Sequence, residues 1–407
     1  MSRTETIPLA LIALFFLVAS AAPLGAQEGR APGARGGPLI RPSPIELPEA
    51  LDAFVAALAR RETDPSATVR VFHYGDSNIA ADLLTKVVRD GLGARYGSSE
   101  GGYLLPVGVG SIRRGRVAHV EPRGLWQTRR RGYVRDFGVS DGRYGLAGVS
   151  VEGAPGSSLA VRVPEDSCGR RLEVHSLADT PGHVEVRVDG APIPAVPAEG
   201  GLALVRAELD GASHDVTVRV VGGRARVLGV VVERPHGLAY DVFGINGHRV
   251  SAINGWDEAL LRAQIAGRTP DLVILSYGGN EAIDRGLPLG TYEQESFRAV
   301  AKVRGLAPDA SCLISAPLAT FEEHAPRMRA VAAIQRRVAM SLGCAFWDPS
   351  QLSGGPGSLM RWARFEGMVA RDRLHYGPRG YGIVGAAFLR ALWVAIGERS
   401  GAVATPR

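Results

Sequence analysis

Two stretches of the chain alternate strand-like and helix-like hydrophobic patterns. In residues 46–98, one apolar helical face precedes the strand-like run ATVRVFHYG, and the helical segment NIAADLLTKVVRDGL follows it. In residues 236–398, four more strand-like runs alternate with helical segments: YDVFG, LVILSYG, SCLISAP and CAFWDP. A last helical pattern follows His375. Five strands that alternate with helices predict an α/β fold in which one parallel sheet carries helices on both faces.

The pattern changes between these two stretches. Residues 99–235 contain short runs of strand-forming residues, such as LAVRVP, HVEVRVDG and HDVTVRVVGG, separated by turn-forming residues. Antiparallel strands at this spacing are typical of a β-sandwich or jelly roll. We therefore expect a β-rich domain, residues 99–235, inserted into a discontinuous α/β domain made of residues 46–98 and 236–398.

The N-terminus has the features of a secretory signal. A positively charged start precedes an apolar run at residues 7–18, and small residues follow it. Because this run is short for a bilayer span, residues 1–26 are predicted to be a signal peptide cleaved within 21–26. An uncleaved N-terminal anchor is the alternative. Residues 27–45, rich in Gly, Pro and Arg, predict a flexible linker. The mature protein is then expected to be secreted or periplasmic, with no membrane span.

Composition adds few constraints. With 45% hydrophobic and 22% charged residues, the chain is typical of a globular protein, which excludes a disordered or collagen-like one. The net charge of +6 comes almost wholly from arginine. The basic run RRRGYVR permits a polyanionic partner without requiring one. The sequence has no H-E-x-x-H motif, P-loop or paired cysteines, so we expect no metal, no cofactor and no nucleic-acid partner.

Three cysteines give neither a disulfide framework nor metal-ligand spacing. Cys312 and Cys344 both lie in apolar, strand-like runs. We therefore expect buried free thiols. A bridge between these two residues requires that their strands be neighbours with suitable side-chain directions, and it is the less favoured alternative.

Polar and glycine-rich loops follow the predicted strands. In an open parallel sheet, ligands bind beyond the carboxyl ends of the strands. Three of these ends, together with the loop before the last helix, carry GDSN at 75–78, GINGH at 244–248, GGNEA at 278–282 and DRLH at 372–375. We expect these loops to converge at one edge of the sheet.

Each loop also has an ordinary structural explanation: Ser77 can cap a helix, glycines make turns, Asn280 can brace a loop, and Asp-x-x-His can be a surface turn. Acyl transfer, however, needs a nucleophile, a base, an orienting acid and an oxyanion hole together. We therefore expect Ser77 as nucleophile, His375 as base and Asp372 as the orienting acid. The N–H groups of Ser77 and Gly247 and the amide of Asn280 are the expected oxyanion donors.

Other candidate residues are weaker. The segment GSSEG at 97–101 matches G-x-S-x-G, but it follows a helical run instead of a strand, so we interpret it as a loop. His73 lies within the first strand-like run, where a buried, hydrogen-bonded histidine is expected rather than a catalytic one.

The four loops resemble the four blocks of the SGNH (GDSL-like) hydrolase superfamily, and this resemblance implies a three-layer, flavodoxin-like fold. More narrowly, the inserted β-rich region and the segments FGINGH and SYGGNEA resemble bacterial peptidoglycan O-acetylesterases. In that group the insertion resembles a carbohydrate-binding module. The resemblance implies an acetylated glycan as partner and removal of O-acetyl from the C6 hydroxyl of N-acetylmuramic acid in peptidoglycan.

The chain departs from that group at three positions. Related sequences usually have His where this chain has Asn78, a small residue where it has His248, and often Thr where it has Gly279. Together with Asp76, these residues are expected to line the substrate pocket, so the departures concern the identity of the substrate more than hydrolysis itself.

Three functions remain open at this point: a glycan O-acetylesterase, an O-acetyltransferase that passes the acyl group to a sugar hydroxyl, and a non-catalytic carbohydrate-binding protein. The inserted region also carries aromatic residues that can either stack on sugar rings or belong to a core. They are Tyr103, Trp126, Tyr133, Phe137 and Tyr144.

Overall fold

A five-stranded parallel sheet forms the centre of the α/β part of the chain. The computed structural model describes residues 38–400 except 39, 107–117, 131–140 and 373. The strand order is β14-β1-β15-β16-β17, with bounds Gly237–Gly244 for β14, Thr68–Gly75 for β1, Leu272–Ser276 for β15, Ser311–Ser315 for β16 and Ala345–Trp347 for β17. The predicted five-strand parallel sheet is therefore confirmed.

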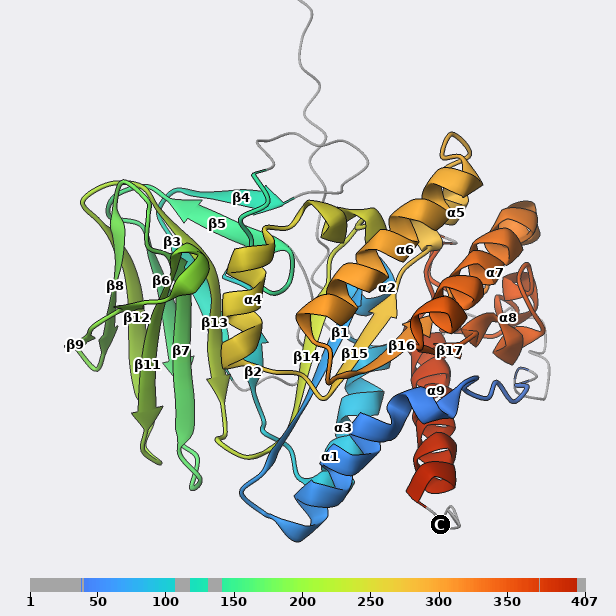
Figure 1. Ribbon diagram of the computed structural model, residues 1–407, viewed down its shortest axis with the longest axis horizontal. Helices are drawn as coiled ribbons and strands as arrows, with labels where there is room; N and C mark the ends of the chain where they lie inside the picture. Colours follow the sequence, from blue (N-terminus) through green and yellow to red (C-terminus); the bar gives the residue numbers. More distant parts are fainter. Residues whose placement is uncertain (1–37, 39, 107–117, 131–140, 373, 401–407) are drawn as a thin grey trace, which may run out of the picture. The chain divides into compact units, whose positions relative to one another are not determined.

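Helices cover both faces of this sheet, because successive strand residues point to opposite sides. Val71 contributes to the core beneath α1, α3 and α9, whereas Phe72 contributes to the core beneath α4, α6 and α7. Figure 1 shows these helices around the sheet. The helix bounds are α1 Asp52–Thr63, α2 Ser77–Ala80, α3 Leu84–Tyr96, α4 Glu258–Gly267, α5 Gly279–Ile283, α6 Leu289–Leu306, α7 Ala325–Leu342, α8 Leu359–Trp362 and α9 Pro378–Ser400.

The helical pattern predicted over 78–92 is divided into two helices, α2 and α3. The break lies at Asp82, which is fully buried and has a positive φ of 49°. Its carboxylate accepts a hydrogen bond from the hydroxyl of Thr85 at 2.5 Å and pairs with Arg89 at 2.9 Å. Periodicity alone did not reveal this break, because the apolar spacing continues through it.

Residues between Gly102 and Glu233 form two antiparallel sheets. One has seven strands, ordered β10-β11-β7-β13-β5-β4 with β2 paired to β13, and the other has the order β3-β6-β12-β8-β9. Residues of both sheets share one hydrophobic cluster. That these sheets form a separate inserted domain stays a prediction. Their strands are β2 Gly102–Leu104, β3 His119–Arg123, β4 Trp126–Arg130, β5 Val149–Gly153, β6 Ser158–Val163, β7 Arg170–Leu177, β8 His183–Val188, β9 Ala191–Ile193, β10 Val196–Pro197, β11 Leu202–Leu209, β12 His214–Val221 and β13 Ala225–Glu233.

Aromatic residues of this region divide between core and surface. Tyr103 and Tyr144 are buried, which favours the core interpretation for them. Trp126 is half-buried beside Leu125, which is 77% exposed. Tyr133 and Phe137 lie outside the described residues.

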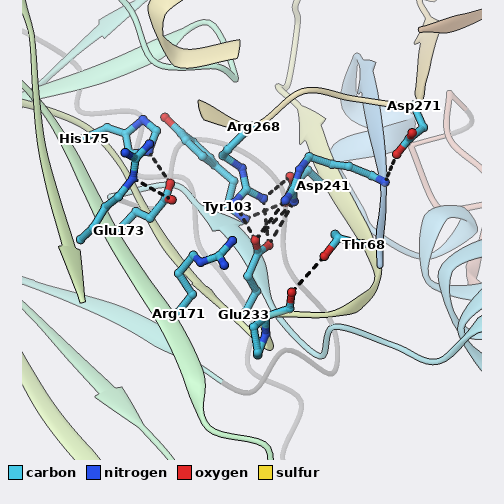
Figure 2. Close-up of polar contacts among 12 residues, drawn as sticks. Thr68, Tyr103, Arg171, Glu173, His175, Glu233, Asp241, Arg268 and Asp271 are labelled. Atoms are coloured by element: carbon cyan, nitrogen blue, oxygen red, sulfur yellow. Dashed lines mark hydrogen bonds and ion pairs between the residues drawn. The ribbon is translucent and has the colours of Figure 1, made fainter. Parts of the chain in front are cut away.

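A buried group of charges joins the antiparallel strands to the parallel sheet. Arg268, which follows α4, pairs with Glu233 of β13 at 2.9 Å and with Asp241 of β14 at 2.7 Å. Arg70 of β1 reaches the same glutamate at 3.3 Å. Figure 2 shows Arg268 pointing toward both carboxylates. Burial lowers the pKa of Arg268, but the carboxylates of Asp241 and Glu233 outweigh that effect and hold it above its ordinary value.

The expectation of free thiols at Cys312 and Cys344 is wrong, because these residues form a disulfide. Cys312 lies on β16 and Cys344 directly precedes β17, and these two strands are hydrogen-bonded neighbours in the sheet. Strand order therefore brings the two side chains together, with 4.7 Å between their Cα atoms. The remaining cysteine, Cys168, is a free, exposed thiol.

The predicted signal peptide, most of the predicted linker and much of the basic run at 129–135 lie outside the described residues. Contacts with the α/β part begin at Arg41, whose N–H donates to the carbonyl of Leu352 at 2.9 Å. Within the described part of the chain, residues Pro378–Arg399 of α9 are long and apolar enough to cross a membrane, but 56% of that window is buried inside the protein. Phe388 and Leu392 of this helix pack in the hydrophobic core.

Candidate active site

Ser77 lies two residues beyond Gly75, the end of β1, at a point where three strand ends are in register. Gly75 pairs with Gly244 of β14 on one side and with Ser276 of β15 on the other. The loops that begin after these strands are therefore neighbours, as the sequence predicts. Asp76, not Ser77, caps α2, because its carboxylate accepts the N–H of Asn78. The hydroxyl of Ser77 is thus available for another partner.

That partner is His375. The Nε2 atom of the imidazole lies 2.6 Å from Oγ of Ser77, and its Nδ1 atom lies 2.7 Å from Oδ2 of Asp372. The other carboxylate oxygen of Asp372 accepts the N–H groups of Leu374 at 2.9 Å and of His375 at 3.0 Å. Serine, imidazole and carboxylate therefore form one continuous hydrogen-bonded chain with the geometry of a catalytic triad.

The surroundings favour the charged form of Asp372. Burial alone raises the pKa of its carboxyl, but the hydrogen bond from the His375 ring and those from two backbone N–H groups outweigh this effect. The net pKa lies below the ordinary value of an aspartate. An ionised Asp372 accepts a hydrogen bond from Nδ1–H, which keeps that proton on Nδ1 and leaves Nε2 free to act as a base.

Asn280 is connected to the loop that contains Gly247. Its side-chain nitrogen donates to the backbone carbonyl of His248 at 2.9 Å, and because an amide has two N–H groups, one remains for a ligand. Gly247 has a φ of 72°, in a turn closed by a hydrogen bond of 3.1 Å from the N–H of His248 to the carbonyl of Ile245. A glycine adopts this backbone conformation without steric cost.

Asp76 connects the serine turn to the loop that carries Asn280. Its Oδ1 atom accepts the backbone N–H and the side-chain amide of Asn78, at 2.9 and 3.0 Å, and its carboxylate also accepts the N–H of Gly279. A Cβ atom at position 279 would lie 3.0 Å from Oδ2 of Asp76, so the two loops are closely packed there. Burial raises the pKa of Asp76. This carboxylate is 3% exposed and faces protein groups, so we assign it to bracing the loops.

The other histidines near these loops are buried. His248 is 1% exposed, and its ring centroid lies 6.5 Å from those of Trp256 and Tyr277. In this position the imidazole does not line an accessible pocket, contrary to expectation. His73 lies 2.7 Å from the hydroxyls of Tyr240 and of Ser276, and burial lowers its pKa to about 3. A structural role for His73 agrees with the sequence-based expectation.

Sequence reasoning missed Glu281. Its carboxyl group accepts the N–H of Val250 at 2.9 Å and that of Gly278 at 3.2 Å, and it therefore links the two loops that carry the expected oxyanion donors. Burial is the main reason that its pKa is raised to about 7, and the charge of Asp76 adds to the shift. A glutamate three residues after the start of a helical turn is a recognised capping signal, and that signal was present in GGNEA.

Sequence reasoning also missed Tyr381, in the first turns of α9. Its hydroxyl donates to Oδ1 of Asn78 at 2.7 Å, and the ring is 2% exposed. No local sequence signal connects positions 78 and 381. Among the described residues, no group of three or more His, Cys, Asp or Glu side chains is arranged to hold a metal ion.

A comparison with protein families covers part of this site. The sequence model of the GDSL-like Lipase/Acylhydrolase family matches residues 210–383, a span that contains Gly247, Asn280, Asp372 and His375 but not Ser77. A search of curated proteins gives no significant match.

Solved structures supply the comparison for the whole fold. A peptidoglycan O-acetylesterase superposes with a TM-score of 0.71 at 23% identity, covering 85% of this chain and 96% of that one. A family two carbohydrate esterase from Cellvibrio japonicus aligns with a TM-score of 0.28 at 12% identity, over 69% of this chain and 98% of that one. The chain therefore resembles the GDSL-like Lipase/Acylhydrolase family over residues 210–383 and shares the fold of the solved peptidoglycan O-acetylesterase.

Proposed function

We propose that this protein is a secreted serine esterase that removes O-acetyl groups from a polysaccharide, with the C6 O-acetyl of N-acetylmuramic acid in peptidoglycan as its substrate. One observation carries the proposal: Ser77, His375 and Asp372 form a continuous hydrogen-bonded chain. The match to the GDSL-like family supports ester hydrolysis. The acetylated glycan is proposed from the resemblance of the sequence and from the fold of the similar peptidoglycan O-acetylesterase.

The first half of the reaction forms an acyl-enzyme. Oγ of Ser77 attacks the acetyl carbonyl carbon while Nε2 of His375 takes the hydroxyl proton. The carbonyl oxygen becomes negatively charged and is stabilised by the N–H groups of Ser77 and Gly247 and by the Asn280 amide, each worth about 3 kcal/mol in such sites. The bond from the carbonyl carbon to the sugar oxygen then breaks, and the imidazolium gives its proton to that oxygen.

The second half restores the enzyme. A water molecule attacks the acetyl carbon of the acyl-enzyme, and His375 accepts one of its protons. The bond to Oγ of Ser77 breaks, acetate leaves, and the serine recovers its proton from the imidazolium. The side chains of His375 and Asp372 are 33% and 48% exposed, so water has access to the base.

Secretion is supported by the disulfide between Cys312 and Cys344, because disulfides persist in oxidising compartments and are rare in the cytosol. A periplasmic or extracellular location also matches the proposed substrate, which lies in the cell wall.

The decisive experiment measures acetate released from purified O-acetylated peptidoglycan and from acetylated xylan, by the wild-type protein and by Ser77→Ala. We expect release from peptidoglycan to be faster, and to fall about 10⁵-fold or more in the variant because the nucleophile is missing. Faster release from xylan would overturn the peptidoglycan assignment while leaving the esterase.

The same assay separates the alternatives. Acetylated acceptor glycan appearing faster than free acetate would identify a transferase. Glycan binding by a wild-type protein that releases no acetate from any ester would identify a non-catalytic carbohydrate-binding protein.

A further inference from the structure

Asn78 is the residue directly after the nucleophile, and both ends of its side-chain amide are bound to protein. The amide nitrogen donates to Oδ1 of Asp76 at 3.0 Å, and the amide oxygen accepts the hydroxyl of Tyr381 at 2.7 Å. The backbone N–H of Asn78 donates to the same aspartate oxygen at 2.9 Å. These contacts form a chain from Asp76 through Asn78 to Tyr381, and they leave the amide turned toward the protein.

The position of Tyr381 shows what this series of hydrogen bonds connects. Tyr381 lies on α9, which begins at Pro378, three residues after His375. The segment before α9 is held partly by its own short-range contacts: Asp372 binds the N–H groups of Leu374 and His375, and the N–H of Ala370 donates to the carbonyl of His375 at 2.9 Å. The bond between Tyr381 and Asn78 instead connects the helix after His375 to the turn that carries Ser77.

We propose that Asn78 and Tyr381 are positioning residues, which hold the serine turn against α9 so that Oγ of Ser77 stays within hydrogen-bonding distance of His375. Proton transfer between these two atoms needs a short and aligned contact, and a small displacement of reacting groups can cost about 10²-fold in rate. The hydroxyl of Tyr381 remains a hydrogen-bond donor because its pKa is raised. Burial is the main cause, and the charge of Asp76 adds to it. The phenol therefore keeps its proton over the working pH range.

Position 78, which the sequence led us to expect in the substrate pocket, then has a positioning role instead. A side chain bound at both ends by protein does not select a glycan, so its loss should slow every ester alike. The inference rests on the proposed function only in taking Ser77 and His375 as the reacting pair; it does not depend on the identity of the glycan.

The test uses the full-length mature protein with three variants: Asn78→Ala, Tyr381→Phe and the double variant. Each is assayed on a small soluble ester, p-nitrophenyl acetate, and on O-acetylated peptidoglycan. We expect each single variant to lower kcat about 10- to 100-fold on both substrates with KM nearly unchanged. Both changes remove the same hydrogen bond between Asn78 and Tyr381. The kcat of the double variant should therefore be close to that of the less active single variant.

Two further measurements separate positioning from general damage. Tyr103→Phe is the matched control: it removes one buried hydroxyl, which donates to the carbonyl of Leu228 at 2.6 Å, an acceptor outside the connection between Asn78 and Tyr381. This variant should keep its kcat. Asn78→His retains a ring donor and a ring acceptor, so it should recover most of the activity that Asn78→Ala loses. The rate of inactivation by a fluorophosphonate, which requires an activated serine but no glycan, should fall in parallel with kcat.

Defined results would overturn the inference. A loss confined to peptidoglycan, or a rise in KM with unchanged kcat, would make Asn78 a substrate contact. Multiplicative losses in the double variant would show that the two residues act independently. If the proposed function is wrong and the inference right, the wild-type protein releases no acetate from glycan, yet its Ser77-dependent hydrolysis of p-nitrophenyl acetate still responds to all three variants.

Discussion

At the scale of single residues, the orientation of one imidazole decides whether Ser77 is a nucleophile. His375 is held by Asp372 at Nδ1 and faces Ser77 with Nε2. The aspartate is itself fixed by two backbone N–H groups of its own loop. The sequence spacing Asp-x-x-His was sufficient to predict this pair, because both residues lie in one turn.

Replacing Asp372 with Asn tests that orientation. The amide is nearly the same size but presents an N–H group, which favours the wrong tautomer of His375 and removes the charge that stabilises the imidazolium. We expect kcat on p-nitrophenyl acetate to fall about 10³- to 10⁴-fold with the fold retained. A fall of less than tenfold, in a variant with wild-type circular dichroism, would show that Asp372 does not orient the base.

At the scale of elements, the loops after β1, β14 and β15 are joined by two buried carboxyl groups. Asp76 links the serine turn to Gly279, and Glu281 links Gly278 to Val250 at the start of the short 3₁₀ helix Val250–Gly255. The two groups are close enough for the charge of Asp76 to raise the pKa of Glu281, while Arg249 lowers it. Burial dominates, and the pKa of Glu281 is raised to about 7.

This shift predicts a pH-dependent stability that Glu281→Gln removes. Because the folded pKa is about 7 and the ordinary value 4.5, the folded protein holds a proton that the unfolded chain loses between these values. The contribution of Glu281 to stability is therefore greatest below pH 4.5 and declines as pH rises toward 7, by an amount on the order of 3 kcal/mol at most. Urea unfolding of both proteins at pH 5 and pH 8 measures it: the advantage of wild type over the variant should shrink at pH 8. An equal difference at both pH values would contradict the assignment.

At the scale of the whole molecule, the antiparallel strands and the parallel sheet meet at a buried ionic group. Arg268 contacts Glu233 at the end of β13 and Asp241 within β14, and Tyr103 of β2 donates its N–H to the same Asp241 at 2.6 Å. These charges have side-chain exposures of 1% or less. A buried charge without its partner is costly. The carboxylates of Glu233 in the antiparallel region and of Asp241 in the parallel sheet therefore both depend on the charge of Arg268.

Substituting Arg268 with Met should destabilise the protein by about 3–5 kcal/mol, because it leaves two buried carboxylates with Arg70 as their remaining cation in this group. Arg60→Met is the matched control, since Arg60 pairs with Asp271 across 3.3 Å but has a side chain that is 55% exposed. That variant should cost less than about 1 kcal/mol. Urea unfolding measures both. Equal effects of the two substitutions would show that the buried group does not stabilise the fold.

The hydrophobic periodicity alone determined the five parallel strands, the antiparallel region and the long helices, because these patterns follow from side-chain directions that repeat within one element. Motif spacing also determined Ser77, Asp372 and His375 as candidates, since Ser77 follows a predicted strand and the loop with Asp372 and His375 precedes the last helix. Only the tertiary structure decided the rest. The disulfide depends on β16 lying beside β17, the break at Asp82 on a buried partner at Arg89, and the buried position of His248 on packing against Trp256. The contact between Asn78 and Tyr381 joins residues 303 positions apart. Such contacts depend on how helices and strands pack against one another. The separation of two residues along the chain does not predict whether packing brings them into contact.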